Sequence, residues 1–349
     1  MPHPQYSETA SAEAHFDEQC LFRSGDNDYH AYRIPALLAL GQGRVIAVCE
    51  GRRDSLADDG DIDIVMKRSG DGGRTWSEAE VLLEGAGDTV GNPCLIFAPE
   101  GPVIWLTFCR NNRQVLVMKS TNDGDSWSEL VEITEKVMPP GWTYIGTGPG
   151  HGIQMQNGRL IVPCWVGDNA RIHGEVQASF VFYSDDDGET WKHGSVLDKD
   201  VCDECEVVEL ADGTLYMNAR SRHGKKQRAF STSNDGGDSW SPLEHAPSLP
   251  ELSCQGSIIS LKDPDSPQRD LILLAAPSNT ERRSHLTVSI SRDVGQTWPV
   301  TRLICEGSAA YSDLAVTSES EILCLYESDN YTRITLARFN LNWCMSAPG

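Results

Sequence analysis

An eight-residue motif that recurs along the chain constrains its fold more than any other feature of the sequence. The pattern is S-x-D-x-G-x-[ST]-W, and one copy has Asn122 in place of the aspartate. The five copies are SGDGGRTW (69–76), STNDGDSW (120–127), SDDDGETW (184–191), SNDGGDSW (233–240) and SRDVGQTW (291–298). Their tryptophans lie 49 to 64 residues apart. A period near fifty residues is typical of a β-propeller in which each repeat forms one blade.

The segments between the motifs favour strands. Short apolar or alternating runs are separated by Gly, Asp and Asn, and long helical periodicity is nearly absent. This pattern predicts many short antiparallel strands. Five marked blades and one unmarked blade, closed by the C-terminal strands, fit into the 349 residues. We therefore predict an all-β fold, a six-bladed β-propeller of four-stranded antiparallel blades.

The repeated motif predicts structure and not activity. Its Asp and Ser side chains are expected to hydrogen-bond the backbone of a tight hairpin, its Gly to adopt a conformation that other residues avoid, and its Trp to fasten the turn to the blade. We expect all five copies on turns far from any active site. No linker or shift in composition divides the chain. We predict a loose polar extension over residues 1–18 and a single β-propeller domain over residues 19–349.

The chain is strongly acidic, with a formal net charge of −22. This charge argues against a nucleic-acid partner, which would require a basic face. No apolar stretch approaches the length that spans a bilayer, and the N-terminus lacks the cationic start and apolar core of a signal peptide. The eleven cysteines, an odd number found mostly in strand-like runs, favour reduced and buried thiols. We expect a cytoplasmic protein, or a secreted one if a signal has been removed.

The sequence CDEC, residues 202–205, has the C-x-x-C spacing of zinc and redox motifs. Neither a second C-x-x-C nor a pair of histidines supplies the other half of a zinc site, and no βαβ pattern surrounds the motif. We therefore predict no metal and no cofactor.

The repeats, together with YRIP (32–35), resemble the sialidase (neuraminidase) family over essentially the whole chain. The segments that occur in the family's order are YRIPALL, EGRRDS, GNPC, TGPGHGIQ, ECEVVEL, NARS, CQGS and AYSDL. The resemblance implies an exo-α-sialidase that removes terminal α-linked sialic acid with retention of configuration. It implies a sialylated glycan as the partner, and it leaves the oligomeric state unknown.

A sialoside carries an ionised carboxylate on its anomeric carbon, and the planar guanidinium of arginine can bind such a group through two hydrogen bonds. Arg33 of YRIP and Arg220 of NARS match the first two arginines of the family's triad. The third falls on Arg282 or Arg283, and we favour Arg283 because it keeps the family's spacing to the following strand. Arg52 of EGRR resembles the arginine that helps to hold the acid loop and the substrate carboxylate.

The same carboxylate would repel a carboxylate nucleophile, and sialidases with a tyrosine nucleophile are a known exception among glycosidases. Tyr311 of AYSDL occupies the family's nucleophile position. A phenol with a pKa of about 10 is a weak nucleophile and requires an adjacent base. Glu204 of ECEVVEL matches that base. Glu206, two residues further along a strand, would point the same way and remains the competitor.

The general acid is expected to be an aspartate on a partly exposed loop. Counted back from the strand that follows RRDSLADDGDID, the family's acid falls on Asp58. Asp59 is the alternative. The adjacency of the two carboxyls would raise the pKa of one of them, which suits a general acid. Asn92 and Pro93 of GNPC, and Gln255 of CQGS, match positions that line the family's pocket. Asn92 and Gln255 could equally be turn residues.

Two other functions remain open from the sequence. A trans-sialidase, or a hydrolase of another nonulosonic acid, would use the same residues on a different acceptor or sugar. The lack of an appended lectin-like domain weakens the transferase alternative. A non-catalytic, glycan-binding propeller belongs to a different class, and binding alone would not require a phenol beside a base. Turnover of a fluorogenic sialoside would separate an enzyme from a binding module.

Overall fold

The computed structural model describes residues 13–168, 176–197, 202–222 and 224–346. Within these ranges helices are few and short: α1 (Thr134–Val137), α2 (Leu341–Met345) and the 3-10 helix η1 (Asp26–Asp28). Nearly all other regular structure is β-strand, so the predicted all-β class is confirmed. None of the helices in this part of the chain is long and apolar enough to cross a membrane.

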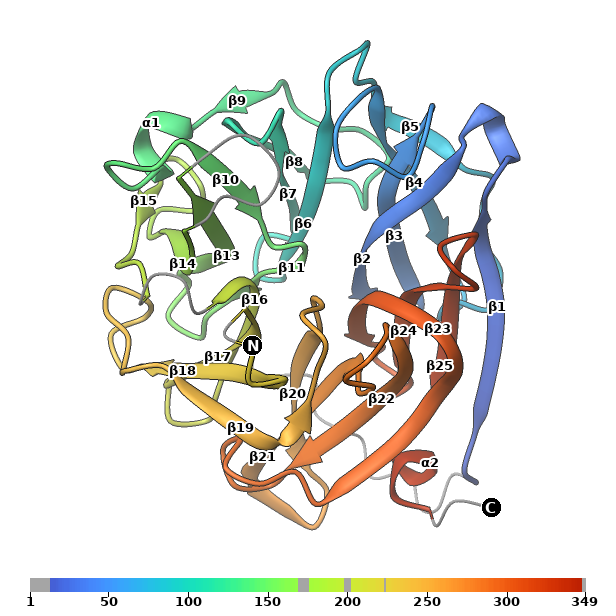
Figure 1. Ribbon diagram of the computed structural model, residues 1–349, viewed down its shortest axis with the longest axis vertical. Coiled ribbons are helices and arrows are strands. Elements are labelled where there is room, and N and C mark those ends of the chain that lie inside the picture. Colours follow the sequence, from blue (N-terminus) through green and yellow to red (C-terminus); the bar gives the residue numbers. More distant parts are fainter. Residues whose placement is uncertain (1–12, 169–175, 198–201, 223, 347–349) are drawn as a thin grey trace.

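The strands form five sheets, which are arranged around a common centre (Figure 1). Neighbouring strands are antiparallel, except for β11 beside β6. The first sheet holds β2 (Ala31–Gly41), β3 (Arg44–Arg52), β4 (Ile62–Ser69) and β5 (Glu80–Leu83). The second holds β6 (Val90–Ala98), β7 (Val103–Arg110), β8 (Gln114–Ser120), β9 (Val131–Glu132) and β11 (Gly150–His151). The third holds β10 (Tyr144–Thr147), β12 (Ile153–Gln154), β13 (Leu160–Gly167), β14 (Gln177–Ser184) and β15 (Lys192–His193).

The two remaining sheets are built mainly from the C-terminal half of the chain. The fourth holds β16 (Cys202–Glu209), β17 (Leu215–Ser221), β18 (Gln227–Ser233) and β19 (Glu244–Pro250). The fifth has seven strands: β1 (Phe16–Arg23), β20 (Ser257–Asp263), β21 (Ser266–Pro277), β22 (Ser284–Ser291), β23 (Val300–Val316), β24 (Ile322–Ser328) and β25 (Arg333–Phe339). Strands β2, β6, β16 and β20 border the central region (Figure 1).

Strand β23 is 17 residues long and changes its partner halfway. Its first half, residues 300–308, pairs with β22, and its second half, residues 309–316, pairs with β24. This shared strand merges β20–β22 with β24, β25 and β1 into one sheet. The sequence predicts six separate four-stranded blades, whereas the described residues form five hydrogen-bonded sheets. The number differs because β23 pairs with β22 in one group of strands and with β24 in the next.

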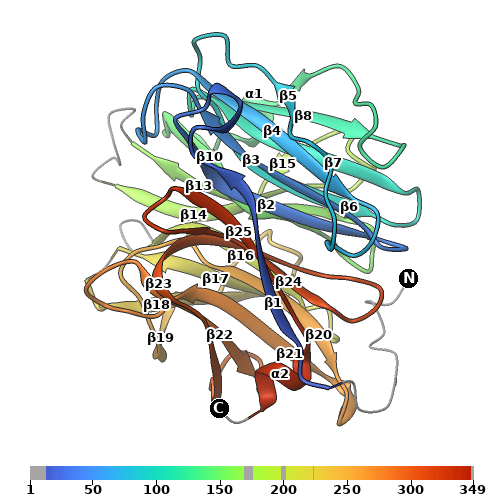
Figure 2. The same ribbon diagram turned by 90° about the vertical axis from the view of Figure 1, so that its right-hand side faces the viewer.

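Strand β1 brings the beginning of the described chain to its end. It pairs with β25 from Phe16 opposite Phe339 onward, and Figure 2 shows the two strands alongside one another. Arg338 of β25 binds Asp17 of β1 through both Nε and Nη2. Because β1 begins at Phe16, the last three residues of the predicted extension lie in a strand. Residues 1–12 lie outside the described part of the chain.

The five repeated motifs form the same turn. In the first copy, Ser69 Oγ accepts a hydrogen bond from Gly73 N at 2.9 Å, and Asp71 accepts bonds from the N and Oγ1 of Thr75 at 2.8 and 2.6 Å. Gly73 has a φ of 82°, which only glycine adopts readily, and Trp76 Nε1 donates to its carbonyl. The other four copies repeat the serine-to-glycine and aspartate contacts, including the copy with asparagine. The structural interpretation of the motif is confirmed.

The register of the first sheet places its motif far from the other end of the same hairpin. Val45 of β3 lies opposite Ser69, which begins the motif, whereas Arg52 lies opposite Ile62. Seven residues of extended strand separate these two ends by roughly 23 Å.

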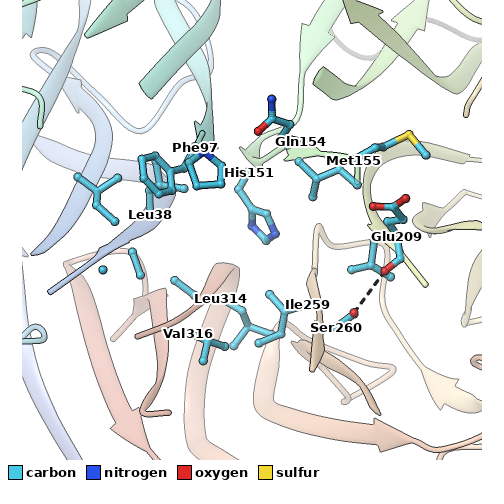
Figure 3. A pocket seen from close by; sticks show the side chains of 18 of the residues that line it. Leu38, Phe97, His151, Gln154, Met155, Glu209, Ile259, Ser260, Leu314 and Val316 are labelled. Carbon is cyan, nitrogen blue, oxygen red and sulfur yellow. Dashed lines mark hydrogen bonds between the residues drawn. The ribbon is translucent and has the colours of Figure 1, made fainter. Parts of the chain in front are cut away.

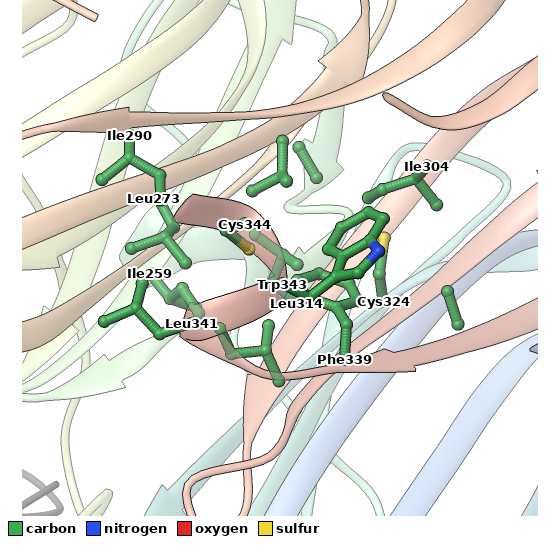
Figure 4. Close-up of a cluster of buried hydrophobic side chains, with 14 of the residues drawn as sticks. Ile259, Leu273, Ile290, Ile304, Leu314, Cys324, Phe339, Leu341, Trp343 and Cys344 are labelled. Carbon is green, nitrogen blue, oxygen red and sulfur yellow. The ribbon is translucent and has the colours of Figure 1, made fainter. Parts of the chain in front are cut away.

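Buried apolar side chains fill the space between the sheets. In the cluster of Figure 4, the short helix α2 contributes Leu341, Trp343 and Cys344 to a core formed with Leu273 and Ile290. The side chain of Asn340 accepts a hydrogen bond from Trp343 N at 2.9 Å and caps the helix. Helix α2 thereby covers one end of the seven-stranded sheet.

All eleven cysteines are free thiols, and nine of them are buried. Cys202 and Cys205 both lie in β16, and the Cys205 thiol lies 3.4 Å from the carbonyl of Cys164. Burial raises the pKa of Cys205 above its ordinary range. These two thiols are part of the core between two sheets.

Candidate active site

Tyr311 and Glu204 meet although 107 residues separate them in the sequence. Tyr311 lies in the second half of β23 and Glu204 near the start of β16. The phenol oxygen and Glu204 Oε1 are 2.5 Å apart. Arg220 Nη1 donates to the phenol oxygen at 3.0 Å and to Glu204 Oε2 at 2.7 Å. Because a guanidinium can only donate, the phenol accepts from Arg220 and directs its own proton to Glu204.

Both members of this pair are buried, Tyr311 with 6% and Glu204 with 5% of its surface exposed. Burial raises the pKa of Tyr311 well above its usual value, and the neighbouring Glu204 carboxylate raises it further, while Arg220 and Arg283 act in the opposite direction. The phenol therefore keeps its proton at neutral pH. A carboxylate at hydrogen-bond distance is the group that can remove it.

Three arginines from different elements surround Tyr311. The Cζ atoms of Arg33 in β2 and Arg283 next to β22 lie 5.3 and 5.4 Å from the centre of its ring, and Arg220 in β17 contacts its oxygen. Arg282, the alternative to Arg283, is exposed. The structure thus gathers the three favoured arginines into one cluster, which is suited to binding an anionic group.

A buried acidic residue that the sequence analysis did not identify holds Arg33 in place. Glu327 of β24 accepts hydrogen bonds from Arg33 Nε at 2.9 Å and Nη2 at 3.2 Å. Its two oxygens also accept from the backbone N of Ile34 at 3.0 Å and of Tyr311 at 3.3 Å. The ring of Tyr331 lies 4.7 Å from Arg33 Cζ. A charged residue within the apolar run ILCLYES was the available signal for Glu327.

The other two arginines share a support. Ser253 Oγ accepts from Arg220 Nε at 3.1 Å, and Ser253 O accepts from Arg283 Nη2 at 2.8 Å. Ser253 has a φ of 44°, an uncommon conformation for a residue with a side chain. The carboxylate of Asp203 lies 3.5 Å from Arg220 Nε. Neither supporting residue was identified from the sequence, and no motif marks Ser253.

Arg52 organises the loop that carries Asp58. Its Nε and Nη2 bind Glu50 Oε2 at 2.9 and 2.7 Å, and its Nη1 donates to the carbonyls of Leu56 and Ala57. The same Nη1 lies 2.8 Å from Asp58 Oδ1. Asp58 Oδ1 also accepts from Arg33 Nη1 at 3.1 Å, while 58% of the Asp58 side chain is exposed. An exposed carboxylate therefore reaches the arginine cluster from a loop.

The alternative acid, Asp59, lies next in the same loop and is also exposed. The interactions with the two arginines involve Asp58. The geometry therefore distinguishes these neighbouring carboxylates by their contacts.

The positions that the resemblance assigns to the pocket wall differ in their surroundings. Asn92 is half-buried with a φ of 55°, and its N donates to Glu50 Oε1 at 2.9 Å, which links it to Arg52. Pro93 follows it where β6 shifts register against β7. Gln255 is 1% exposed, and its side-chain amide exchanges two hydrogen bonds of 2.9 Å with the backbone of Ser312. These bonds fix the backbone of the residue after Tyr311.

Glu206, the competitor of Glu204, belongs to a separate buried network. Its Oε2 accepts from Ser257 Oγ at 2.8 Å and from Ile258 N at 2.9 Å. A register shift between Cys202 and Cys205 interrupts the regular alternation of β16 at this point. The two glutamates, although two residues apart, therefore have different partners.

His151, Glu206 and Asp313 are the described residues whose ligand atoms lie close enough to hold a metal ion together. His151 Nδ1 is 2.7 Å from Asp313 Oδ1 and 3.6 Å from Glu206 Oε2. Burial lowers the pKa of His151, but the carboxylates of Glu206 and Asp313 outweigh it and raise the pKa to about 9. Asp313 also accepts bonds from the backbone N of Leu37 and Leu314. Protein donors satisfy these carboxylates, so the residues do not fit a metal site.

Comparison with known proteins gives matches along most of the chain. The BNR repeat-like domain family matches residues 43–324. A sialidase of Bacteroides fragilis is 31% identical over 339 residues, which cover 87% of this chain and 61% of that protein. A sialidase of Micromonospora viridifaciens is 33% identical over 361 residues, which cover 94% of this chain and 54% of that protein. The chain thus spans somewhat more than half the length of these two relatives.

A solved structure described as the Hadza microbial sialidase Hz136 resembles this chain in fold and sequence. The sequence identity is 30% and the TM-score is 0.82. The match covers 91% of this chain and 68% of the other.

Proposed function

Because the chain belongs to the sialidase family, we propose that it is an exo-α-sialidase, a glycoside hydrolase that removes terminal α-linked sialic acid from glycans. The observation that carries this proposal is the 2.5 Å contact between the Tyr311 phenol and Glu204, with three arginines around the phenol. A glycan-binding module would gain nothing from a buried base beside a phenol. Release of 4-methylumbelliferone from its α-sialoside tests the proposal, and no turnover by folded protein would refute it.

We propose the six-bladed propeller as the architecture that carries this site. Two observations support counting the seven-stranded sheet as two blades. Strand β23 changes from β22 to β24 near Ser308, so strands β20–β22 with its first half make four strands. Its second half with β24, β25 and β1 makes another four. The inner strands of such an arrangement converge on one axis, where Arg33, Glu204 and Tyr311 meet.

In the proposed first step, the substrate carboxylate binds the guanidinium groups of Arg33, Arg220 and Arg283. The Tyr311 oxygen attacks the anomeric carbon while its proton passes to Glu204. The bond to the leaving oxygen breaks, and Asp58 donates a proton to that oxygen. A neutral phenol suits this attack, because an anionic nucleophile would meet the negative charge of the sugar carboxylate.

The contacts of Asp58 suggest how the acid is prepared. Asp58 Oδ1 accepts from Arg33 Nη1 and Arg52 Nη1. A bound sugar carboxylate would compete for Arg33, and a second negative charge nearby favours the protonated form of Asp58. In the second step, Asp58 takes a proton from water, which attacks the anomeric carbon. The bond to Tyr311 then breaks, and the phenol regains its proton from Glu204.

Two displacements at one carbon retain its configuration, so we predict that the first sugar released is the α-anomer. A time course of proton NMR spectra on a sialoside would detect this anomer before it equilibrates with the β-anomer. If the β-anomer forms first, a direct displacement by water takes place, and Tyr311 is not the nucleophile. If no free sialic acid forms and a transfer product accumulates, the alternative of a trans-sialidase applies.

Replacing Asp58 by Ala should lower kcat/KM much more with natural substrates than with activated ones. An acidic leaving group such as 4-methylumbelliferone departs without a proton, whereas the sugar alcohol of sialyllactose requires one. We expect kcat/KM to fall roughly 10²- to 10⁴-fold with sialyllactose and far less with the fluorogenic substrate. Asp59→Ala is the matched control, because its carboxylate is the neighbour in the same loop. Equal losses on both substrates would remove Asp58 from the acid role.

A further inference from the structure

A cavity of about 620 Å³ lies at the opposite end of the strands that carry the candidate active site. Two of these strands show the separation. Strand β16 begins near Glu204 and ends at Glu209, which lines the cavity, and β23 runs from Tyr311 to Val316, which also lines it. Five residues of strand span roughly 16 Å. This cavity is therefore distinct from the arginine cluster.

The inner part of the cavity is apolar. Figure 3 shows Leu38, Phe97, Ile259 and Leu314 around a central space, with the ring of His151 projecting into the middle. Its volume lies within the range of about 300–1,000 Å³ that is usual for small-molecule sites. An alkyl chain placed there would leave water for an apolar surface, which is the main source of affinity in such sites.

The charged side chains that the cavity offers to a ligand are acidic. Its lining includes Glu209 and Glu100 but no lysine or arginine among the described residues. Only 5% of Glu209 is exposed. Its Oε2 accepts a hydrogen bond of 2.8 Å from Gln156 N, and its Oε1 has no hydrogen-bond partner within the described part of the chain. Burial raises the pKa of Glu209, which reflects the cost of keeping this carboxylate charged without a cation nearby.

His151 does not offer a competing site for an anion. Its Nδ1 lies 2.7 Å from Asp313 Oδ1 and 3.6 Å from Glu206 Oε2. The positive charge of the imidazole is thus matched by two carboxylates. An anionic ligand would find no uncompensated cation among the described residues that line this cavity, and the net charge of −22 would oppose its approach.

We propose that this cavity binds an amphiphilic amine, with an alkyl chain between Leu38, Ile259 and Leu314 and the ammonium group on Glu209. The ammonium donates to the unpartnered Oε1 and supplies the cation that the buried carboxylate lacks. This ligand class follows from the apolar walls, the buried Glu209 carboxylate beside them and the absence of Lys and Arg from the described lining.

Calorimetric titration with three probes of equal chain length tests the proposal on the full chain. We expect octylammonium to bind, octanol to bind more weakly, and octanoate not to bind. Glu209→Gln keeps an oxygen for Gln156 N and removes the charge, so it should weaken octylammonium binding roughly tenfold or more and leave octanol binding unchanged. Equal affinity of octylammonium and octanol would refute the role of Glu209.

A second variant tests the place of binding without touching the carboxylate. Val316→Trp puts a large side chain into the lining and should abolish binding of octylammonium. Leu303→Trp is its control, because Leu303 lies in the same strand β23, is 43% exposed and does not line the cavity. Unchanged binding to folded Val316→Trp, or no binding to the unmodified chain, would overturn the proposal. These measurements do not depend on turnover, so they stand apart from the test of the sialidase activity.

Discussion

Tyr311→Phe is expected to lower kcat by roughly 10³-fold or more on activated and natural sialosides alike, because the covalent route requires the phenol oxygen. The measurement is kcat with 4-methylumbelliferyl sialoside and with sialyllactose. Activity on the two substrates should fall together, unlike with Asp58→Ala, because the Tyr311 oxygen must displace either leaving group, whether or not that group needs a proton. Turnover near the original rate with both substrates would exclude Tyr311 as the nucleophile.

The fold should survive this substitution. The Tyr311 oxygen contacts Glu204 and Arg220, which remain paired with each other at 2.7 Å when the oxygen is removed. An unchanged circular dichroism spectrum and thermal transition would establish that the loss is chemical. Tyr331→Phe is a suitable control, since the Tyr331 ring also lies against Arg33 but its oxygen has no part in the proposed reaction. We expect that variant to keep most of its activity.

The second large effect concerns the carboxylate of the sugar. Arg283→Ala should raise KM by roughly 100-fold, because a charged hydrogen-bond donor to that carboxylate is lost. Arg283 is the most informative member of the cluster, since its guanidinium donates to the carbonyl of Ser253 and, among the described residues, no buried carboxylate depends on it. Arg33→Ala and Arg220→Ala should raise KM as strongly, but they would also leave Glu327 or Glu204 buried without a cation.

Arg282→Ala provides the control for Arg283→Ala, because the two arginines are adjacent and Arg282 is exposed. Its KM should stay within about twofold of the original value, as expected for a surface substitution. A substrate analogue with a hydroxymethyl group in place of the carboxylate adds a second check. It should bind the original protein and Arg283→Ala equally. A raised KM for Arg282→Ala with an unaffected Arg283→Ala would reverse the assignment.

The conformation of the repeated turn could be predicted from the sequence, because it depends on hydrogen bonds between residues that are close in the chain. The turn around Ser69 and Asp71 depends on contacts within a few residues, so its pattern predicts its conformation in every copy. The roles of Tyr311, Glu204 and Arg33 are predicted from segments that resemble the sialidase family. The structure supplies their separations, which arise between residues about a hundred or more positions apart.

The residues that support the site were beyond sequence reasoning for a physical reason. Glu327 binds Arg33, which is 294 positions away in the sequence. Ser253 accepts hydrogen bonds from two arginines in a backbone conformation of positive φ, which no sequence motif predicts. Strand alternation placed Glu206 beside Glu204, but a register shift in β16 separates their partners. The double pairing of β23 likewise depends on how two sheets meet, which periodicity within one strand does not encode.

The pairing of β1 with β25 has a consequence for how the molecule is made. Asp17 and Arg338 are 321 positions apart, so the hydrogen bonds between these strands close a loop of nearly the whole chain. Contacts of such long sequence separation form slowly, because the loop entropy is lost before they are gained. During synthesis, β25 emerges long after β1, and until then β1 has an unpaired edge that can associate with other chains. We therefore expect folding of this protein to compete with aggregation until β1 pairs with β25.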